Sequence, residues 1–580
     1  MGEGRRRVSV FASVLLALTG CVAMPDSGPA GPGREVVESP PEPLRVVALG
    51  PRPGAEPAEI VTGFVRAGAS SDDDQVVARS FLVGAAVRAW QPRRAVVVFP
   101  DDSSLKVIVR GSGTPRQVTV TTPVLATIDE SGRYQQARPG TTATAVFTVV
   151  PSGGAWRVSV VDPAFGTWLP QFSLDRTFSV LPVSFVAADT ATLVPDLRWL
   201  PGPRPSLATA LVRQLLLGPP DHLGAAVVTG FPPGTTLAVD AVPTKDGVAS
   251  VDLSARALSA TPQMRRMLWA QLTTTLRRLP AVADLQLTVA GAPFQVPGVT
   301  STSVFGETTF RDDVRVTGAP VVLAGDRLLR VEATTGRLIA PTATGTPAAV
   351  GLRAISVGSR GALTVAVEQS GRRLVRLTPT GPPTPLLGGR SLIDPVVDLT
   401  GSVWSADLTR PGRLVVLRPQ DDDPQQPARV IAAPWLVGRP VHALDVARDG
   451  ARVAIVSSGP GGVRRVDVSG VVRGPDRQPV ALARPLEVAR SLVGATDVAW
   501  ADRTDLVLLG RAATDAAVRP YDVVVGGTTT ALAPVAGART ITAGDGLRAL
   551  FVTTAAGQVL ARSGTGWRVV GAGRSVSVPE

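Results

Sequence analysis

Leu444-Asp445-Val446, followed by Asp449-Gly450 and then by Val453-Ala454-Ile455-Val456, is one copy of a short pattern that decides the fold of the C-terminal part of this chain. Each copy has an apolar strand, a polar turn that contains Gly or Asp, and a second apolar strand. Such a hairpin buries one face and exposes the other. Further copies lie at Ile355 to Val367, Val397 to Ser405, Asp497 to Leu509 and Ile541 to Val552.

The copies recur at a spacing that is typical of one architecture. A period of about 40 to 55 residues suits four-stranded propeller blades better than the short turns of a solenoid. More hairpin signals lie between the copies, at Asp326-Arg327 and at Gly371-Arg372, each followed by apolar residues. The sequence therefore predicts a β-propeller over residues 320–580, with roughly five to seven blades.

Residues 184–298 show an α+β pattern. Ser206 is the expected N-cap of a helix whose leucines share one face and which Gly218-Pro219-Pro220 stops. A second helix is expected to begin at Thr261 and Pro262, with an apolar residue at every fourth position up to Leu276. The pattern predicts strands at Thr235 to Val242, Val248 to Ser254 and Leu285 to Val289.

Residues 56–183 read as helix followed by strand. Helices are expected at Ala58 to Arg66 and Val76 to Trp90. Strands are expected at Ala95 to Phe99, Leu105 to Val109, Gln117 to Ile128, Ala143 to Val150 and Trp156 to Val161. This order resembles the cone-shaped fold of nuclear-transport-factor-2-like (NTF2-like) domains, which does not by itself establish a function. A linker over residues 299–319 is expected to precede the propeller.

The amino terminus has the anatomy of an export signal. Arg5, Arg6 and Arg7 precede an apolar stretch within the length expected of a secretory signal, about 7 to 15 residues. The four residues Leu18, Thr19, Gly20 and Cys21 resemble a bacterial lipobox. The resemblance implies that residues 1–20 are removed and that Cys21 carries a diacylglycerol and an N-acyl chain such as palmitate. Two or more acyl chains anchor a protein stably. Residues 21–55 are rich in Pro and Gly and read as a tether.

Composition narrows the class of protein. A chain of 580 residues is too long for one hydrophobic core. The formal net charge is +12, and all but two of the 59 basic residues are arginines, scattered along the chain without basic runs. We therefore expect no nucleic acid partner. Cys21 is the only cysteine, which excludes an intramolecular disulfide.

Two resemblances follow from these motifs. Four short stretches together resemble the GerMN domain of spore-germination and envelope proteins. They are Leu215 to Pro219, Phe231 to Thr235, Val251 to Ser254 and Gln271 to Leu276. Lipobox, N-terminal domain, GerMN domain and propeller, in that order, resemble the LpqB family of actinobacterial lipoproteins. That family is associated with the MtrA–MtrB two-component system. The resemblance implies binding to the extracytoplasmic domain of an MtrB-like sensor histidine kinase at the outer face of the cell membrane.

Signs of catalysis are weak. His222 and His442 are far apart in the sequence, and neither has a second His three or four residues on, so we expect no metal site. His442 is expected to make a structural hydrogen bond, and His222 to be solvated. Neither lysine follows a glycine as in a phosphate-binding loop. We therefore expect no enzyme, no catalytic residue and no cofactor, although paired carboxylates stay open.

Several polar residues have a structural and a functional interpretation. Asp252 is expected to cap a turn rather than act as an acid or base. Gln271 and Thr275 lie one helical turn apart and are either partner contacts or surface residues. The acidic runs at 72–74 and 421–423 are expected to be solvated loops.

Three classes of function remain. The first is a tethered module that regulates a sensor kinase. The second is an envelope scaffold or carrier that holds a lipid or glycan in the N-terminal cone, lined by residues such as Phe81, Trp90 and Trp156. The third is a hydrolase or lyase with carboxylates or a metal in the propeller channel. The motifs favour the first.

Overall fold

The computed structural model describes residues 49–69, 75–202, 206–300, 305, 308–316, 318–340, 351–361, 363–379, 381–419 and 427–579. The predicted signal peptide, the lipobox with Cys21 and most of the tether lie outside the described residues, as do the acidic runs at 72–74 and 421–423. Among the helices within the described ranges, none has the length and apolar character to cross a membrane.

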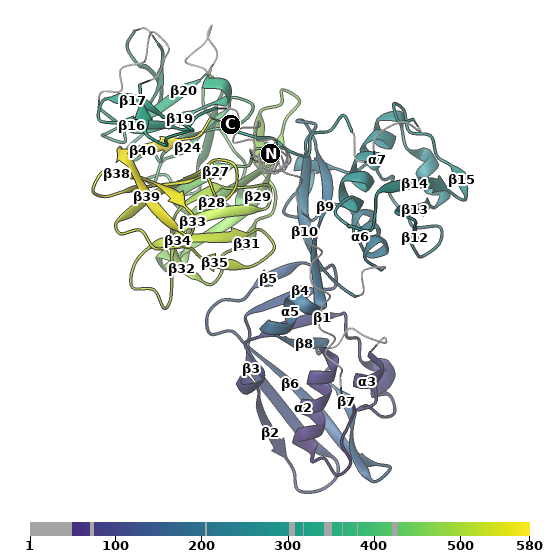
Figure 1. Cartoon of the computed structure of the whole chain (residues 1–580). Helices are drawn as coiled ribbons and strands as arrows, with labels where there is room; N and C mark the ends of the chain where they lie inside the picture. Colours follow the sequence, from purple (N-terminus) through teal and green to yellow (C-terminus); the bar gives the residue numbers. More distant parts are fainter. Residues whose placement is uncertain are drawn as a thin grey trace, which may run out of the picture. The chain divides into compact units, whose positions relative to one another are not determined.

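The described chain begins with an α+β domain (Figure 1). Helix α2 (Pro57–Gly68) starts with a capping box in which Glu56 and Glu59 satisfy each other's backbone amides. Its apolar face, including Ile60 and Phe64, packs into a core shared with β3, β6 and β7. The antiparallel sheet β2-β3-β6-β7 comprises β2 (Lys106–Arg110), β3 (Arg116–Pro123), β6 (Thr142–Ser152) and β7 (Ala155–Val161).

A second sheet completes this domain. It has the order β5-β4-β1-β8. Its strands are β1 (Ala95–Phe99), β4 (Ala126–Asp129), β5 (Tyr134–Gln136) and β8 (Thr167–Pro170), and α5 (Gln171–Thr177) follows β8. The one strand expected from Gln117 to Ile128 is thus two strands, β3 and β4, in different sheets.

The predicted single helix from Val76 to Trp90 is wrong. The structure has two short helices, α3 (Val76–Arg79) and α4 (Ala86–Ala89). Between them Leu82 forms a bridge with Val158, and Gly84 adopts a φ of 62°. Backbone pairing with β7 and a left-handed glycine both interrupt a helix, which the apolar periodicity could not show.

A long hairpin joins the first two domains. Strands β9 (Phe178–Ala187) and β10 (Leu193–Pro201) pair over their full length, and β11 (Val227–Val228) adds to β9. Phe178 and Trp199 pack in a core cluster of the N-terminal domain, whereas Phe185 and Val194 pack in the next one. The boundary predicted at residues 183 and 184 falls inside β9.

The GerMN-like region contains two main helices and a small sheet. The helices are α6 (Leu207–Leu216) and α7 (Pro262–Leu276), and Thr261 caps α7 by accepting from the Met264 amide at 3.3 Å. The sheet β12-β13-β14-β15 has a parallel pair at its centre. Its strands are β12 (Thr244–Lys245), β13 (Val248–Leu253), β14 (Asp284–Val289) and β15 (Ala292–Pro293).

The strand predicted from Thr235 to Val242 is also wrong. Leu237 makes only an isolated bridge with Leu253. Thr235 instead closes a turn, because its hydroxyl donates to the Pro232 carbonyl at 2.7 Å. Side-chain bonds of this kind compete with a regular ladder.

The C-terminal region is a β-propeller, as predicted, and its described residues form six sheets, five with four strands and one with five. One sheet combines the first three strands with the last, in the order β18-β17-β16-β40. Its strands are β16 (Val321–Ala324), β17 (Arg327–Val331), β18 (Leu338–Ile339) and β40 (Ser575–Ser577). The two ends of the region thus close the ring within one blade, which removes an exposed edge.

The other five blades follow in chain order. They comprise β19 (Leu352–Val357), β20 (Thr364–Glu368), β21 (Arg373–Leu377) and β22 (Thr384–Gly388); β23 (Val396–Val397), β24 (Val403–Ala406), β25 (Leu414–Leu417) and β26 (Arg429–Val430); β27 (Val441–Val446), β28 (Arg452–Ser458), β29 (Arg464–Arg473), β30 (Pro479–Leu482) and β31 (Leu486–Val488); β32 (Leu492–Trp500), β33 (Asp505–Ala512), β34 (Arg519–Val524) and β35 (Thr529–Ala531); and β36 (Ala538–Ala543), β37 (Leu550–Thr554), β38 (Gln558–Ser563) and β39 (Gly566–Ala572). Each sequence copy is the first hairpin of one blade.

Candidate functional site: the propeller channel and the junction pocket

The innermost strands of the blades surround a cavity of about 340 Å³. Residues from β19, β23, β27, β32, β36 and β40 line it. Around it stand His442, Asp394, Asp445 and Asp497, together with serines and threonines. The fold therefore brings polar residues from the innermost strands of the blades together around the channel.

Many of these polar side chains join one blade to the next. The Asp445 carboxylate accepts from the Trp500 amide at 2.7 Å, and Asp497 accepts from the Ile541 amide at 2.8 Å. Ser356 accepts in the same way from the Val397 amide at 3.0 Å. Ser575 and Ser577 of β40 accept from the amides of Ile355 and Val357. These hydrogen bonds satisfy backbone groups at the blade interfaces.

Burial changes the ionisation of two of the channel aspartates, Asp497 and Asp445. It raises the pKa of Asp497 to about 8, reinforced by Asp394 and opposed by the hydrogen bond from Ile541. It raises the pKa of Asp445 to about 6, against the hydrogen bond from Trp500. At neutral pH Asp497 is therefore mostly a neutral carboxylic acid.

His442 makes the structural hydrogen bond that the sequence analysis predicted. Its Nε2 lies 2.6 Å from the Ser458 hydroxyl, which comes from the neighbouring strand of the same blade. Burial lowers the pKa of His442, and Arg464 lowers it further. Within the described ranges, no three His, Cys, Asp or Glu side chains are grouped so as to hold a metal ion.

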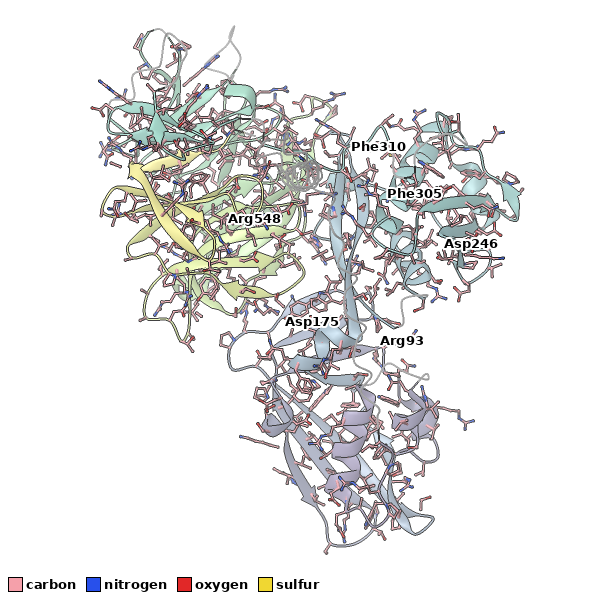
Figure 2. The ribbon with its side chains drawn as sticks, in the orientation of Figure 1. Arg93, Asp175, Asp246, Phe305, Phe310 and Arg548 are labelled. Atoms are coloured by element: carbon pink, nitrogen blue, oxygen red, sulfur yellow. The ribbon has the colours of Figure 1, made fainter. Side chains whose placement is uncertain are left out.

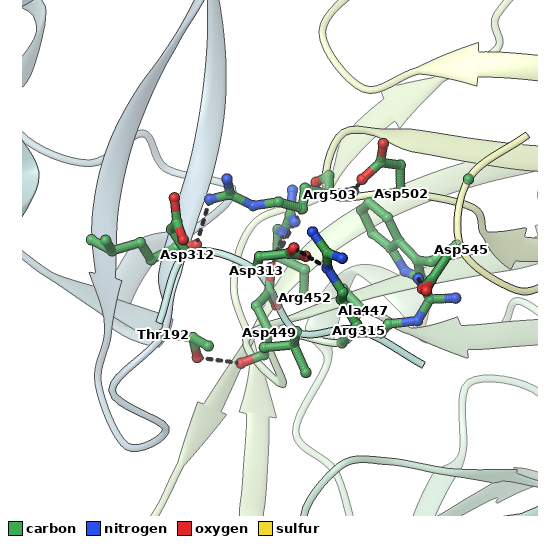
Figure 3. Close-up of a pocket in the computed structure, with 15 residues that line it drawn as sticks. Thr192, Asp312, Asp313, Arg315, Ala447, Asp449, Arg452, Asp502, Arg503 and Asp545 are labelled. Atoms are coloured by element: carbon green, nitrogen blue, oxygen red, sulfur yellow. Dashed lines mark hydrogen bonds and ion pairs between the residues drawn. The ribbon is translucent and has the colours of Figure 1, made fainter. Parts of the chain in front are cut away.

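A second cavity, of about 320 Å³, lies where the β9-β10 hairpin and residues 312–315 meet the propeller (Figure 3). The hydroxyls of Thr190 and Thr192 both donate to the Asp449 carbonyl, at 2.8 and 2.9 Å. The Val316 amide donates to the Asp545 carboxylate at 3.1 Å. We call this cavity the junction pocket.

Arg452 is the buried cation at the junction pocket. Its guanidinium donates to Asp449 at 2.8 Å and to the Arg503 carbonyl at 2.6 Å, and it lies 4.6 Å from the centre of the Trp500 ring. It also reaches the Pro195 carbonyl of β10, at 3.4 Å. The Arg452 guanidinium, in a residue that is only 2% exposed, is therefore compensated by a carboxylate, by backbone carbonyls and by the face of an aromatic ring.

Arg473 of the propeller binds the tip of the β9-β10 hairpin through a similar buried ion pair. Its side chain is 1% exposed and lies 2.9 Å from Asp189 and 3.1 Å from Asp398. Asp398 also accepts from the Trp404 indole and from the amides of Thr400 and Ser402. The sequence analysis included Asp398 in a blade repeat but missed this pairing, because residues 189, 398 and 473 share no local pattern.

The side chain of His222 is only 11% exposed, which corrects the expectation that it is solvated. Its Nε2 lies 3.8 Å from Asp196, which forms an ion pair with the fully buried Arg198. The His222 carbonyl accepts from the Gly470 amide of the propeller at 2.6 Å. Burial lowers the pKa of His222 to about 4, in spite of Asp196, so the ring is neutral at neutral pH. The loop after Pro220 packs against blade strand β29, a tertiary contact with no sequence signal.

Gln271 and Thr275 are neither surface residues nor available to a partner. Both are fully buried. Gln271 accepts from the Gly230 amide at 2.7 Å and donates to the Ser184 carbonyl at 3.0 Å, and Thr275 accepts from the Ser184 amide. These hydrogen bonds hold α7 against β9. Strand β9 therefore covers the face of α7 that carries Gln271 and Thr275.

Asp252 has the structural role that was predicted, at a different turn. Its carboxylate accepts from the Thr288 hydroxyl at 2.8 Å and from the Gly291 amide at 3.0 Å. It therefore stabilises the turn after β14 rather than the turn after its own strand.

The aromatic residues proposed to line a lipid cavity are part of the N-terminal core. Phe81 and Trp90 are each 2% exposed. Trp90 packs edge-on against Phe64, with 4.8 Å between ring centres, and its indole donates to the Gly166 carbonyl. Trp156 is only partly buried and is covered by Arg116 at 4.8 Å. Core packing accounts for all three.

Comparisons with known proteins agree with the order of these domains. Three family models match: the LpqB N-terminal domain at residues 50–174, a domain described as "Sporulation and spore germination" at 182–295, and the LpqB β-propeller domain at 326–580. The two models that carry the LpqB name together cover more than half of the chain.

The chain belongs to the LpqB lipoprotein family. It is 28% identical to Lipoprotein LpqB of Thermobifida fusca, over 95% of this chain and 96% of that one. It is 29% identical to Lipoprotein LpqB of Streptomyces coelicolor, over 88% and 87%. Membership in this family makes the chain an LpqB-type lipoprotein with a propeller and a germination-related domain.

Solved structures resemble parts of this LpqB-family chain. The first GerMN domain of the Bacillus subtilis sporulation protein GerM is 17% identical, with a TM-score of 0.17, and the match covers 22% of this chain and 98% of that one. A chain of a nidogen/laminin complex is 11% identical, with a TM-score of 0.34, over 45% and 97%.

Proposed function

We propose that this chain is a lipid-anchored, extracytoplasmic lipoprotein that binds an MtrB-like sensor histidine kinase and modulates its signalling in growth and cell-envelope control. Membership in the LpqB family supports the proposal, because similarity to LpqB proteins extends over most of the chain. The Leu18 to Cys21 motif supports the lipid anchor.

The observation that carries a binding function is the use of the channel's polar groups. Asp445, Asp497 and Ser356 each accept a hydrogen bond from a backbone amide of the next blade. A general acid or base must reach the proton that it transfers, at about 2.6 to 3.2 Å. Carboxyl groups that already join neighbouring blades favour a rigid binding platform over a catalytic centre.

Binding is sufficient for regulation when it discriminates between signalling states. A partner shifts an equilibrium between two conformations of a receptor only by its difference in affinity for them. Anchoring both proteins in one membrane raises their effective concentration. A tethered platform of modest affinity therefore suffices to bias the kinase.

The test measures binding between the full lipoprotein and the extracytoplasmic domain of the kinase. The domain is immobilised, and the detergent-solubilised lipoprotein is titrated over it. We expect saturable binding to this domain and none to the extracytoplasmic domain of an unrelated kinase. The Cys21→Ser variant should move to the aqueous phase and still bind. Equal signals for the two kinases would refute the proposal.

A further inference from the structure

One face of the propeller gathers arginines that the sequence spreads over four blades. In an antiparallel blade, the loops from second to third strand and from fourth strand to the next blade lie at the same end. Exposed arginines occupy these loops or the strand ends beside them, and six of them are Arg372, Arg390, Arg410, Arg413, Arg511 and Arg539. We call this surface the arginine face.

None of these six guanidinium groups has a hydrogen-bond or ion-pair partner among the described residues, although most arginines of the propeller core do. Arg539 also lines the channel cavity, beside Arg353 and His442. The arginine face therefore surrounds the end of the channel away from the junction pocket.

Four of the six form a continuous cluster. The Arg390 amide donates to the Asp407 carboxylate and the Arg410 amide to the Asp407 carbonyl, both at 2.8 Å. The Arg372 carbonyl accepts from the Gly389 amide at 2.8 Å, and the Arg413 amide donates to the Arg410 carbonyl. The backbone thus places Arg372, Arg390, Arg410 and Arg413 next to one another. We call them the arginine cluster.

The nearby carboxylates do not neutralise the cluster. Burial alone would raise the pKa of Asp407, but hydrogen bonds from the amides of Arg390, Thr409 and Ser391 and from the Thr409 hydroxyl lower it to about 2. Asp407 is therefore ionised at neutral pH, and its two oxygens accept from amides and a hydroxyl of its own turn rather than from a guanidinium. Asp394 pairs with Arg353 at 2.9 Å, and Glu368 pairs with Arg373 at 3.1 Å.

The opposite face differs in charge and in use. Its loops carry Asp502 and Asp545 as well as Arg548, which is labelled in Figure 2. Contacts with the β9-β10 hairpin and with residues 312–316 already cover part of it. The arginine face also carries carboxylates such as Asp326, which pairs with Arg574 at 3.7 Å, and Asp515, but the arginines of the cluster make no ion pair within the described residues.

We propose that the arginine face binds an acidic segment of a partner protein, and that the arginine cluster is its main contact. A guanidinium binds a carboxylate through two parallel hydrogen bonds, which suits side chains of Asp and Glu. Arginine is enriched in protein interfaces. The inference rests on the proposed function: the acidic segment belongs to the extracytoplasmic domain of the sensor kinase.

The apolar residues of this face favour a protein over a membrane. Val437, Val463 and Val493 are exposed in its loops and strand ends. Membrane-surface elements typically present Trp, Phe or Leu beside their basic residues. Small aliphatic side chains among arginines suit a protein surface that carries carboxylates.

The test compares two full-length variants with the same change in charge. One carries Arg372→Glu, Arg390→Glu, Arg410→Glu and Arg413→Glu. The control carries Glu at the exposed residues Arg93, Arg94, Arg337 and Arg548, which lie elsewhere. Because charge reversal at a docking surface acts through close pairs, we expect at least a ~30-fold weaker affinity of the cluster variant for the kinase domain, and less than a ~3-fold change for the control.

The outcomes separate this inference from the proposed function. Equal affinities of the two variants, with binding by the native chain intact, overturn the inference alone. If the native chain does not bind the kinase domain, the proposed function fails, and poly-glutamate becomes the probe. Loss of poly-glutamate binding only in the cluster variant then supports the arginine face as an acidic-segment site. Retained binding overturns it, as does selective loss of binding to phosphatidylglycerol vesicles instead of poly-glutamate.

Discussion

The fully buried Gln271 offers the most direct test of how α7 is held against the β9-β10 hairpin. Its side-chain amide joins two backbone groups that are distant in the sequence, the Gly230 amide and the Ser184 carbonyl. Replacing it by Leu keeps a similar volume and removes both of these hydrogen bonds, together with the one that the Thr229 hydroxyl donates at 3.3 Å. The two backbone groups are then left buried without these partners.

The expected cost follows from those two groups. An unsatisfied buried donor or acceptor costs about 1 to 3 kcal/mol, so the loss of two such partners in Gln271→Leu should destabilise the GerMN-like region by about 2 to 6 kcal/mol. Gln286→Leu is the matched control, because Gln286 is exposed on β14. Substitutions at such surface positions usually change stability by less than about 0.5 kcal/mol.

Hydrogen exchange in the full chain measures this cost locally. When closing is fast, the exchange rate of an amide follows the equilibrium for opening, and about 1.4 kcal/mol corresponds to a factor of ten. We expect peptides from β9 and α7 to exchange at least ~30-fold faster in Gln271→Leu, while peptides from β37 keep their protection. Similar exchange in Gln271→Leu and Gln286→Leu would show that the two hydrogen bonds do not hold the helix.

Two further predictions concern buried charge. The pKa of Asp497 rises from 3.8 to about 8 on folding. The unfolded chain therefore loses this proton at lower pH than the folded chain, and Asp497 lowers the free energy of unfolding progressively from about pH 4 until the effect levels off near pH 8. Asp497→Asn should therefore raise the urea midpoint more at pH 8 than at pH 5, and an equal shift at both would contradict the burial argument. Arg473→Met leaves Asp398 buried without its cation, and should lower stability by about 3 to 5 kcal/mol in thermal unfolding, whereas Arg548→Met should not.

Local patterns in the sequence were sufficient for most regular elements. The blade hairpins, α6 and α7 follow from apolar periodicity and from turn or cap residues that lie within a few positions. The helix expected from Val76 to Trp90 failed for the opposite reason. Pairing between Leu82 and Val158 depends on strand β7, more than 60 residues away.

The interpretation of polar residues depended on long-range packing. Gln271 was assigned to a partner contact or to the surface, and β9 covers it instead. His222 was expected in solvent, and blade strand β29 lies against its loop. Neither covering element has a signature near the residue that it buries.

The sequence by itself determined the order of the domains, the propeller repeat and the lipobox motif at Cys21, because each depends on residues that are neighbours along the chain. Only the tertiary structure decided which charges are buried, as at Arg473, and which are gathered on one surface. The six arginines of the arginine face are scattered in the sequence. They share a surface because the closed ring of blades brings every second loop to the same end.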